Sequence, residues 1–236
     1  GTSTFEMNNN GCDSSDIPFD LLGLNVSLNG VSTNSSVFTN NSGVYNLYAS
    51  IAGEYQLTPN FENPTYFNVS PGVQLFPVID NSTATQNICI TANGVHPDLE
   101  IVIAPITPAR PGFDALYQIV YKNKGNQTLS GSYTFNYDDA KLDFISATAM
   151  PNTLTSGILT WNYANLLPFE NRTVYLTLNM NSPVEIPAVN IGDVFTFSST
   201  INPITGDETP SDNAFAYAQT VVGSYDPNDI TCLEGQ

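Results

Sequence analysis

The residues best suited to chemistry lie in a loop rich in Asn and Asp near the start of the chain. The segment reads Glu6-Met-Asn8-Asn-Asn10-Gly11-Cys12-Asp13-Ser-Ser-Asp16. Oxygen-bearing side chains alternate around a glycine, the arrangement that a hard cation such as Ca²⁺ requires. We therefore predict that this loop binds one Ca²⁺, with ligands drawn from Glu6, Asn8, Asn10, the Cys12 carbonyl, Asp13 and Asp16.

The spacing matches only the first part of an EF-hand-type calcium loop. With Glu6 as the first ligand, Asn10 takes the fifth position and Gly11 the turn position that follows it. The twelfth position is Ile17, which has no carboxylate, so one of the two aspartates of the loop must close the coordination shell. The alternative is that these Asn and Asp residues serve turn geometry alone.

Catalytic constellations are scarce in this sequence. His96 is the only histidine, and it stands between Val95 and Pro97, which favours a structural role over a nucleophile–histidine site. The adjacent acids Asp138-Asp139 and Asp207-Glu208 lie in turns, unlike the separated carboxylates of glycosidases. No phosphate-binding glycine loop follows any expected strand. We predict that the chain is not an enzyme.

The charge of the chain restricts its partners. The net charge is −17, and all five Lys and Arg residues lie at or after Arg110. Such a surface repels phosphate backbones, which argues against nucleic acid. Anionic membrane surfaces are disfavoured for the same reason. No run of eighteen apolar residues occurs, so membrane insertion is not expected.

The chain has three cysteines: Cys12, Cys89 and Cys232. None of them has a histidine or a second cysteine at the spacing of a zinc site. High Asn, Ser and Thr content with little Lys indicates an extracellular protein. In that compartment Cys12 and Cys89 could form a disulfide and leave Cys232 over. The chain does not begin with Met and has no apolar leader, so we interpret it as a piece of a longer protein.

Alternation of apolar and polar residues, with almost no helical periodicity, predicts an all-β protein. Leu24, Val26 and Leu28 share one strand face, and Asn29-Gly30 then predicts a hairpin turn. Two Gly-x-Tyr segments, 43–47 and 53–57, are interpreted as strand starts that each bury one tyrosine. The 13 Phe and 12 Tyr residues can fill the cores of such sandwiches.

A break at residues 93–97 divides the pattern into two halves. We predict a first β-sandwich over residues 1–93, a second over 97–225 and an exit linker over 226–236. The second half contains eight alternating segments, a number typical of an immunoglobulin-like sandwich. They are 99–106, 115–122, 129–136, 142–149, 158–162, 172–180, 194–201 and 214–222. Trp161 shares the apolar face of its strand with Leu159 and Tyr163, so we predict that it is buried.

The first half resembles a known family of surface modules. Its Asn-Gly-Cys-Asp loop, the strand Leu24-Asn-Val-Ser-Leu, Ser42-Gly-Val-Tyr and Ala52-Gly-Glu-Tyr are similar to B-type repeats of bacterial adhesins. These Cna-B and SdrD-B-like domains are transthyretin-like β-sandwiches. The resemblance implies calcium in the loop and places Cys12 and Cys89 in neighbouring elements. A Lys–Asn cross-link, which some repeats form, is excluded because this half has no lysine.

The second half resembles repeat modules of secreted Bacteroidetes proteins. The matching residues are Tyr117-Gln-Ile-Val-Tyr-Lys-Asn-Lys-Gly125, Thr209-Pro-Ser-Asp-Asn213 and Val221-Val-Gly-Ser-Tyr-Asp-Pro-Asn-Asp229. The resemblance implies an immunoglobulin-like sandwich on the outer-membrane surface or secreted, in proteins that use a type IX secretion tail.

Two functions from different classes follow. The first is a calcium-stabilised structural spacer whose partners are neighbouring domains of the same polypeptide. The second is a module that binds polysaccharide or protein through an exposed aromatic face. Candidate rings are Tyr45, Tyr48, Tyr66, Phe67, Tyr133, Tyr137 and Tyr163. Buried rings favour the spacer, and an exposed row of rings favours binding.

Overall fold

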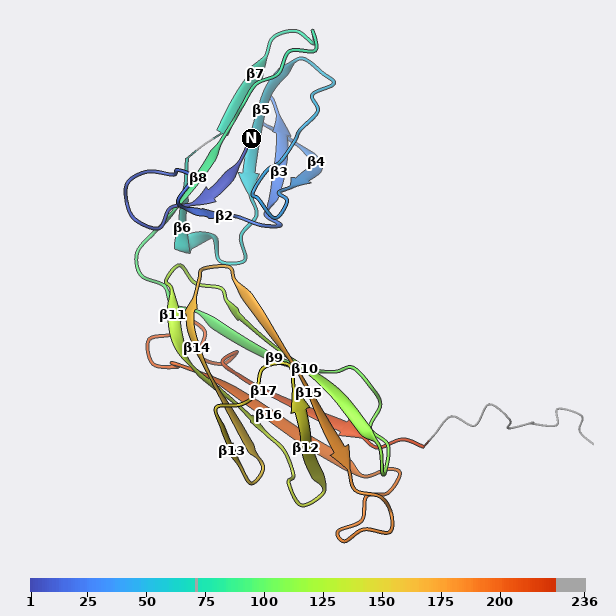
Figure 1. Cartoon of the computed structure of the whole chain (residues 1–236). Coiled ribbons are helices and arrows are strands. Elements are labelled where there is room, and N and C mark those ends of the chain that lie inside the picture. Colours follow the sequence, from blue (N-terminus) through green and yellow to red (C-terminus); the bar gives the residue numbers. More distant parts are fainter. Residues whose placement is uncertain (71, 224–236) are drawn as a thin grey trace, which may run out of the picture. The chain divides into compact units, whose positions relative to one another are not determined.

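The structure is a computed structural model that describes residues 1–70 and 72–223. The chain is all-β, with two β-sandwich units in tandem and, among these residues, no α-helix (Figure 1). Unit 1 comprises residues 1–96 together with 124–127, and unit 2 comprises the other described residues. The predicted exit linker 226–236, and Cys232 with it, lies outside the described residues.

Unit 1 contains two four-stranded sheets and a short 3₁₀ helix η1 (Pro64–Tyr66). One sheet has the order β4-β3-β5-β7, formed by β3 (Gly23–Leu28), β4 (Val31–Phe38), β5 (Gly53–Pro59) and β7 (Gly72–Phe76). The other has the order β2-β1-β8-β6, formed by β1 (Ser3–Phe5), β2 (Ile17–Pro18), β6 (Phe67–Val69) and β8 (Ile88–Ala92).

The hairpin between β3 and β4 follows from its two turn residues. Asn29 and Gly30 both have positive φ, at 52° and 77°, as a tight hairpin turn requires. On β3 the alternating Leu24 and Val26 are 0% and 3% exposed, so the predicted face of this strand is the core face.

The second sheet depends on β1, which precedes the Asn- and Asp-rich loop. This strand pairs in parallel with β8, with Thr4 opposite Cys89. The sequence pattern did not identify this strand, because its three residues, with the burial pattern buried–intermediate–buried, are too few to show alternation. The Asn- and Asp-rich loop connects β1 to β2.

One of the two predicted Gly-x-Tyr strand starts was also wrong. Gly53 does open β5, and Tyr55 is buried, but in segment 43–47 only Val44 forms an isolated bridge, with Thr2. Gly43 packs against β1 so closely that a Cβ there would lie 2.4 Å from the Ser3 carbonyl oxygen. The segment lies beside the start of the chain, where the Tyr45 amide donates to the Gly1 carbonyl at 2.9 Å, and Tyr45 is buried as predicted.

Unit 2 consists of a four-stranded and a five-stranded sheet. The order β12-β15-β10-β9 comprises β9 (Leu99–Pro105), β10 (Asp114–Asn123), β12 (Leu142–Ala147) and β15 (Asn171–Met180). The order β13-β14-β11-β16-β17 comprises β11 (Leu129–Asn136), β13 (Thr153–Thr155), β14 (Ile158–Leu166), β16 (Val194–Asn202) and β17 (Ala214–Thr220). The eight predicted strands are present, and the three-residue β13 was missed.

The core of unit 2 is built from stacked aromatic rings. Tyr133 and Trp161 stack at 5.2 Å between ring centroids, and Tyr117 packs on Phe197 at 4.7 Å. Their polar atoms are satisfied inside the sandwich: Trp161 Nε1 donates to the Ala149 carbonyl at 2.7 Å, and the Tyr117 hydroxyl donates to Gln219 at 2.6 Å. Trp161 is 2% exposed, as the alternation predicted.

This core makes unit 2 sensitive to alkali. Burial raises the pKa of Tyr117, Tyr133 and Tyr163, and burial, assisted by a hydrogen bond to Asp139, raises the pKa of Tyr137 to about 12. In the unfolded chain a tyrosine titrates near pH ~10. Above that pH the unfolded state loses protons that the folded state keeps, so the stability of unit 2 should fall as pH rises.

Urea unfolding measured at increasing pH, with tyrosinate absorbance as a second signal, checks this prediction. Protein already unfolded in urea at each pH is the control, since its tyrosines titrate without protection. Complete tyrosine ionisation near the ordinary pKa in protein that stays folded would contradict it.

Candidate functional site

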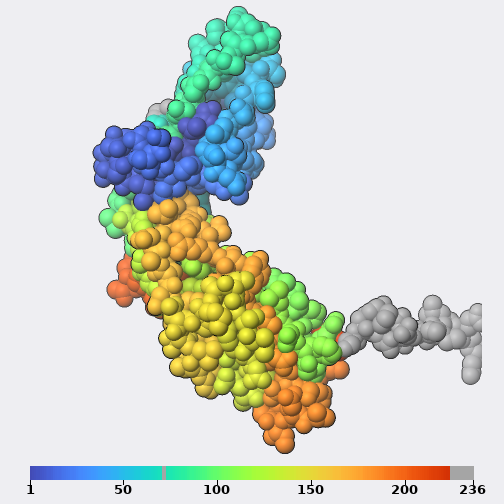
Figure 2. Space-filling model, viewed as in Figure 1, coloured from blue at the N-terminus to red at the C-terminus, as the bar shows by residue number. Residues whose placement is uncertain are grey.

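The loop 6–16 protrudes from unit 1 between β1 and β2 (Figure 1), and Figure 2 shows it as a dark-blue projection. Glu6 directly follows β1, and Asp16 directly precedes β2. Because these strands pair antiparallel, with Phe5 opposite Ile17, they bring the two acids together at the base of the loop. The Glu6 amide also donates to the Ile90 carbonyl at 2.9 Å, which fixes Glu6 on β8.

Glu6 and Asp16 form a buried pair of carboxylates. They are 7% and 6% exposed, and one oxygen of each lies within 4.8 Å of the other and of Cys12 Sγ. Glu6 Oε1 accepts from the Asn8 amide at 2.8 Å, whereas Oε2 is buried and makes no hydrogen bond within the described part of the chain. Two close, buried negative charges repel, and a cation would offset that repulsion.

Loop amides already organise Asp16. Its Oδ1 accepts from the Met7 amide and its Oδ2 from the Asp13 amide, each at 2.9 Å. These bonds draw the two arms of the loop towards one carboxylate. Carboxylate oxygens are ligands that Ca²⁺ prefers, so Glu6 and Asp16 are the side chains of the loop best placed to hold a cation.

The other expected side-chain ligands bond mainly to one another. Asn8 Oδ1 accepts from the Asn10 amide at 3.1 Å, and Asn10 Nδ2 donates to Asp13 at 3.2 Å. Asp13 also accepts from the hydroxyl and amide of Ser15, bonds that lower the pKa of the Asp13 carboxyl. A cation that took Asn8 Oδ1 or the Asp13 carboxylate as a ligand would compete with these bonds, whereas the Asn10 side chain is engaged only through its Nδ2 among the bonds of the described residues.

A disulfide joins Cys12 to Cys89, with 5.6 Å between their Cα atoms. The sulfur of Cys12 is therefore not a thiolate ligand, and only the Cys12 carbonyl oxygen remains for a cation. Cys89 lies on β8 opposite Thr4 of β1, so the bond attaches the middle of the loop to the strand that pairs with β1.

A second group of acids, which the sequence did not reveal as a cluster, lies in unit 2. One oxygen each of Asp98, Asp207 and Asp212 lies within 4.8 Å of the others. Asp207 Oδ2 accepts from the Leu99 amide at 2.9 Å and from Asn213 Nδ2 at 3.2 Å. Asp207 thus fastens the connection between β16 and β17 to the start of β9, which is a structural role.

The residues weighed as catalytic groups have structural contacts. The His96 ring stacks on Tyr66 at 4.4 Å, and its amide donates to Asn126 Oδ1 at 2.8 Å. Asp139 accepts from the hydroxyls of Ser156 and Tyr137 at 2.7 and 3.0 Å, and the Ser156 bond lowers the pKa of the Asp139 carboxyl. A general acid needs a shift in the opposite direction.

The aromatic residues weighed as a binding face are mostly internal. Tyr66 is partly buried and Tyr48 is 90% exposed. The remaining candidates are buried: Tyr45, Phe67, Tyr133, Tyr137 and Tyr163. These rings do not form a coplanar exposed row.

No protein-family model matches the sequence, and no curated protein matches it. Among solved structures, a CARDB domain of the PF1109 protein from Pyrococcus furiosus, in complex with di-metal ions, is 14% identical. It covers 56% of this chain and 100% of its own, with a TM-score of 0.38. The major pilin subunit BcpA of Bacillus cereus is 12% identical over 94% of this chain and 67% of its own (TM-score 0.35). At these values neither similarity identifies a function.

No helix among the described residues is long and apolar enough to cross a membrane.

The disulfide closes a long loop and should contribute strongly to the stability of unit 1. Replacing Cys12 and Cys89 together by Ser, in a Cys232→Ser background, should lower the free energy of unfolding by about 4 kcal/mol in the chain-entropy model, because the loop spans 77 residues. Urea unfolding gives the difference, and the Cys232→Ser protein is the matched control. Equal stability of the two proteins, or three free thiols in the native chain, would contradict the assignment.

Proposed function

We propose that the chain is a non-catalytic structural module of a multidomain surface protein, a stalk segment whose first unit is stabilised by Ca²⁺. The observation that carries this proposal is the burial of the aromatic rings that would otherwise form a binding face. Both units place five of the seven candidate rings inside sandwiches, where they stabilise folding. On this view its partners are the neighbouring domains of the same polypeptide.

The chemistry of the chain supports a location outside the cell. A disulfide persists in oxidising compartments and is rare in the cytosol. The net charge of −17 favours solubility and attracts divalent cations. The resemblance to adhesin B-type repeats and to modules of secreted Bacteroidetes proteins supports the outer-membrane surface, with type IX secretion as the export route.

The carboxylate pair at the base of the loop supports a calcium role. Glu6 and Asp16 are buried together, no Lys or Arg occurs in the first 109 residues, and one Glu6 oxygen has no hydrogen bond within the described residues. A bound Ca²⁺ would join the ends of β1 and β2. The cation would thus hold the loop where the disulfide already constrains it.

Calcium should raise the melting temperature of unit 1. At free Ca²⁺ about a hundredfold above Kd, binding to the folded state alone adds about 3 kcal/mol. Differential scanning calorimetry with CaCl₂ and then with EDTA measures the shift. Glu6→Gln and Asp16→Asn should each remove most of it, because each deletes a buried charge that faces the cation.

The exposed Asp20→Asn provides a control that removes the same charge near β2 but outside the loop. It should retain the calcium response. An unchanged melting profile of the native protein in CaCl₂ and EDTA would show that the cation has no stabilising role.

A stalk segment should also resist extension under load. In oxidised unit 1 the pulling force passes through the disulfide between Cys12 and Cys89. The chain between these two residues therefore cannot be extended by the force. Single-molecule pulling should therefore show an extension shorter by roughly 270 Å than in reduced protein, at about 3.5 Å per residue. Cys232→Ser protein excludes other pairings. Equal extensions in both states would contradict this mechanical role.

A further inference from the structure

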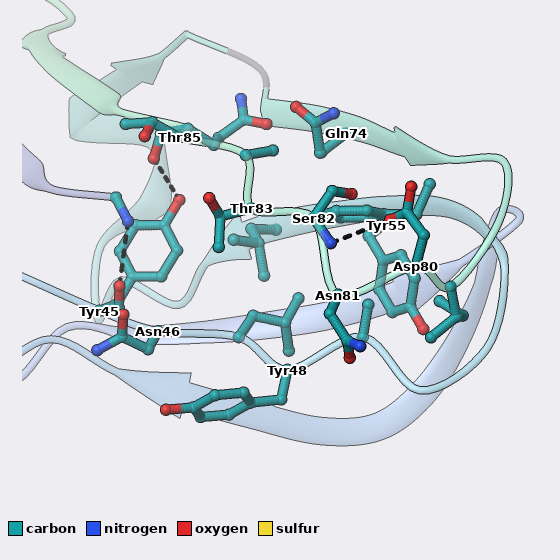
Figure 3. A pocket seen from close by; sticks show the side chains of 18 of the residues that line it. Tyr45, Asn46, Tyr48, Tyr55, Gln74, Asp80, Asn81, Ser82, Thr83 and Thr85 are labelled. Carbon is teal, nitrogen blue, oxygen red and sulfur yellow. Dashed lines mark hydrogen bonds between the residues drawn. The ribbon is translucent and has the colours of Figure 1, made fainter.

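Unit 1 contains a cavity of about 530 Å³ at one end of its sandwich (Figure 3). The cavity forms because the second sheet is short. The pairing of β1 with β8 begins at Ser3 and Ile88, whereas β5 and β7 continue further, with Gly53 opposite Phe76. The inner face of these two strands is therefore covered by the irregular segments 45–49 and 78–86 rather than by strands.

The apolar part of the cavity lining combines aromatic rings with aliphatic side chains. Tyr55 lies opposite Gln74 across the β5–β7 pair, and Tyr55 packs edge-on against Phe76 at 6.0 Å between centroids. Tyr45 closes one wall through its hydroxyl, which donates to the Gln86 carbonyl at 2.5 Å. Tyr48 contributes a ring that is 90% exposed. A large, exposed ring beside a cavity is a surface that ligands commonly use.

Neutral polar groups surround these rings. Figure 3 shows Asn46 projecting from one irregular segment and Asn81 and Thr83 from the other, with Gln74 on the sheet. Among the described residues no hydrogen bond engages the side chains of Asn46, Asn81 or Thr83. Amides and hydroxyls each both donate and accept, so they match a ligand rich in hydroxyl groups.

The charge and polarity of the cavity lining exclude two classes of ligand. None of the described residues that line the cavity is Lys, Arg or His, and Asp80 is the one acid among them. Hydrogen bonds from the side chain and amide of Ser82 lower the pKa of the Asp80 carboxyl and keep it ionised. The Asp80 carboxylate would repel an anionic ligand, and the described side chains of the lining offer no Lys, Arg or His to bind it. A fully apolar ligand would leave the surrounding amides and hydroxyls desolvated and unpaired.

We propose that this cavity binds the end of a neutral oligosaccharide. Sugar C–H faces pack on Tyr48 and the inner rings, and sugar hydroxyls bond to Asn46, Gln74, Asn81 and Thr83. The Asp80 carboxylate accepts from one further hydroxyl. This is a binding function in addition to the stalk role, and it does not depend on calcium at the loop 6–16.

Nuclear magnetic resonance titration of the ¹⁵N-labelled full chain tests the proposal. The probes are neutral hexasaccharides of glucose, mannose and xylose, with hexagalacturonate as the anionic counterpart and laurate as the apolar one. At millimolar concentration at least one neutral sugar should shift the amides of Asn46, Tyr48, Gln74, Asn81 and Thr83. Hexagalacturonate and laurate should leave them unchanged.

Two substitutions then test the assigned contacts. Tyr48→Ala should weaken binding about tenfold, and Asn46→Ala should weaken it several-fold, because each removes an assigned contact. Both side chains are exposed and neither residue has a positive φ, so their removal leaves the fold intact. Tyr175→Ala, a partly exposed tyrosine of unit 2, is the matched control and should not change the affinity.

Four results would overturn the proposal. They are binding of none of the neutral sugars, shifts confined to residues outside the cavity, unchanged affinity in Tyr48→Ala, and binding of laurate or hexagalacturonate in place of the neutral sugars. None of these results bears on the calcium-dependent melting of unit 1, so the two proposals fail separately.

Discussion

The parallel pairing of β1 with β8 closes unit 1, and the other features of this unit depend on it. The pairing places Phe5 and Ile90 in the core at 1% and 0% exposure, and it joins the beginning of the chain to a strand more than eighty residues later. Closing so large a loop costs conformational entropy. The Cys12–Cys89 disulfide reduces that cost by holding the loop after β1 against β8 in the unfolded chain as well.

The two units solve the problem of core formation differently. Unit 2 has sheets of four and five strands, and its long strands β10, β14, β15 and β16 enclose an aromatic core that needs no cross-link. Unit 1 has strands of two and three residues in its second sheet. Such strands bury little apolar area, so a covalent constraint replaces part of the hydrophobic contribution. The disulfide lies in the unit that requires it.

The sequence predicted those features that depend on local pattern. Alternation located the eight long strands of unit 2, and Asn29-Gly30 located the hairpin of unit 1, because each signal lies within a few residues. The three-residue strands β1 and β13 were missed, since they are shorter than one clear period. Tyr45 was correctly predicted to be buried but wrongly assigned to a strand, because alternation reports burial and not hydrogen-bond partners.

The candidate sites were predictable to different degrees, because only residues close together in the sequence give a readable pattern. Glu6 and Asp16 belong to one loop, so their proximity was accessible from spacing, although their burial was not. The cluster of Asp98, Asp207 and Asp212 joins residues more than a hundred positions apart, and only the sandwich topology brings them together. The cavity was inaccessible to sequence reasoning, because it arises where one sheet ends before the other.

The carboxylate pair and the cavity lie at opposite ends of the same short strand. Glu6 follows β1 and Gly1 lines the cavity, so the two residues are about 16 Å apart along an extended chain. Ser3 is held between them by hydrogen bonds to Gly43 and Phe19, which leave β1 little freedom to slide. Any constraint that fixes β1 in register against β8 therefore also fixes the edge of the cavity. The proposed stalk role and the proposed binding site consequently require the same strand to stay in place.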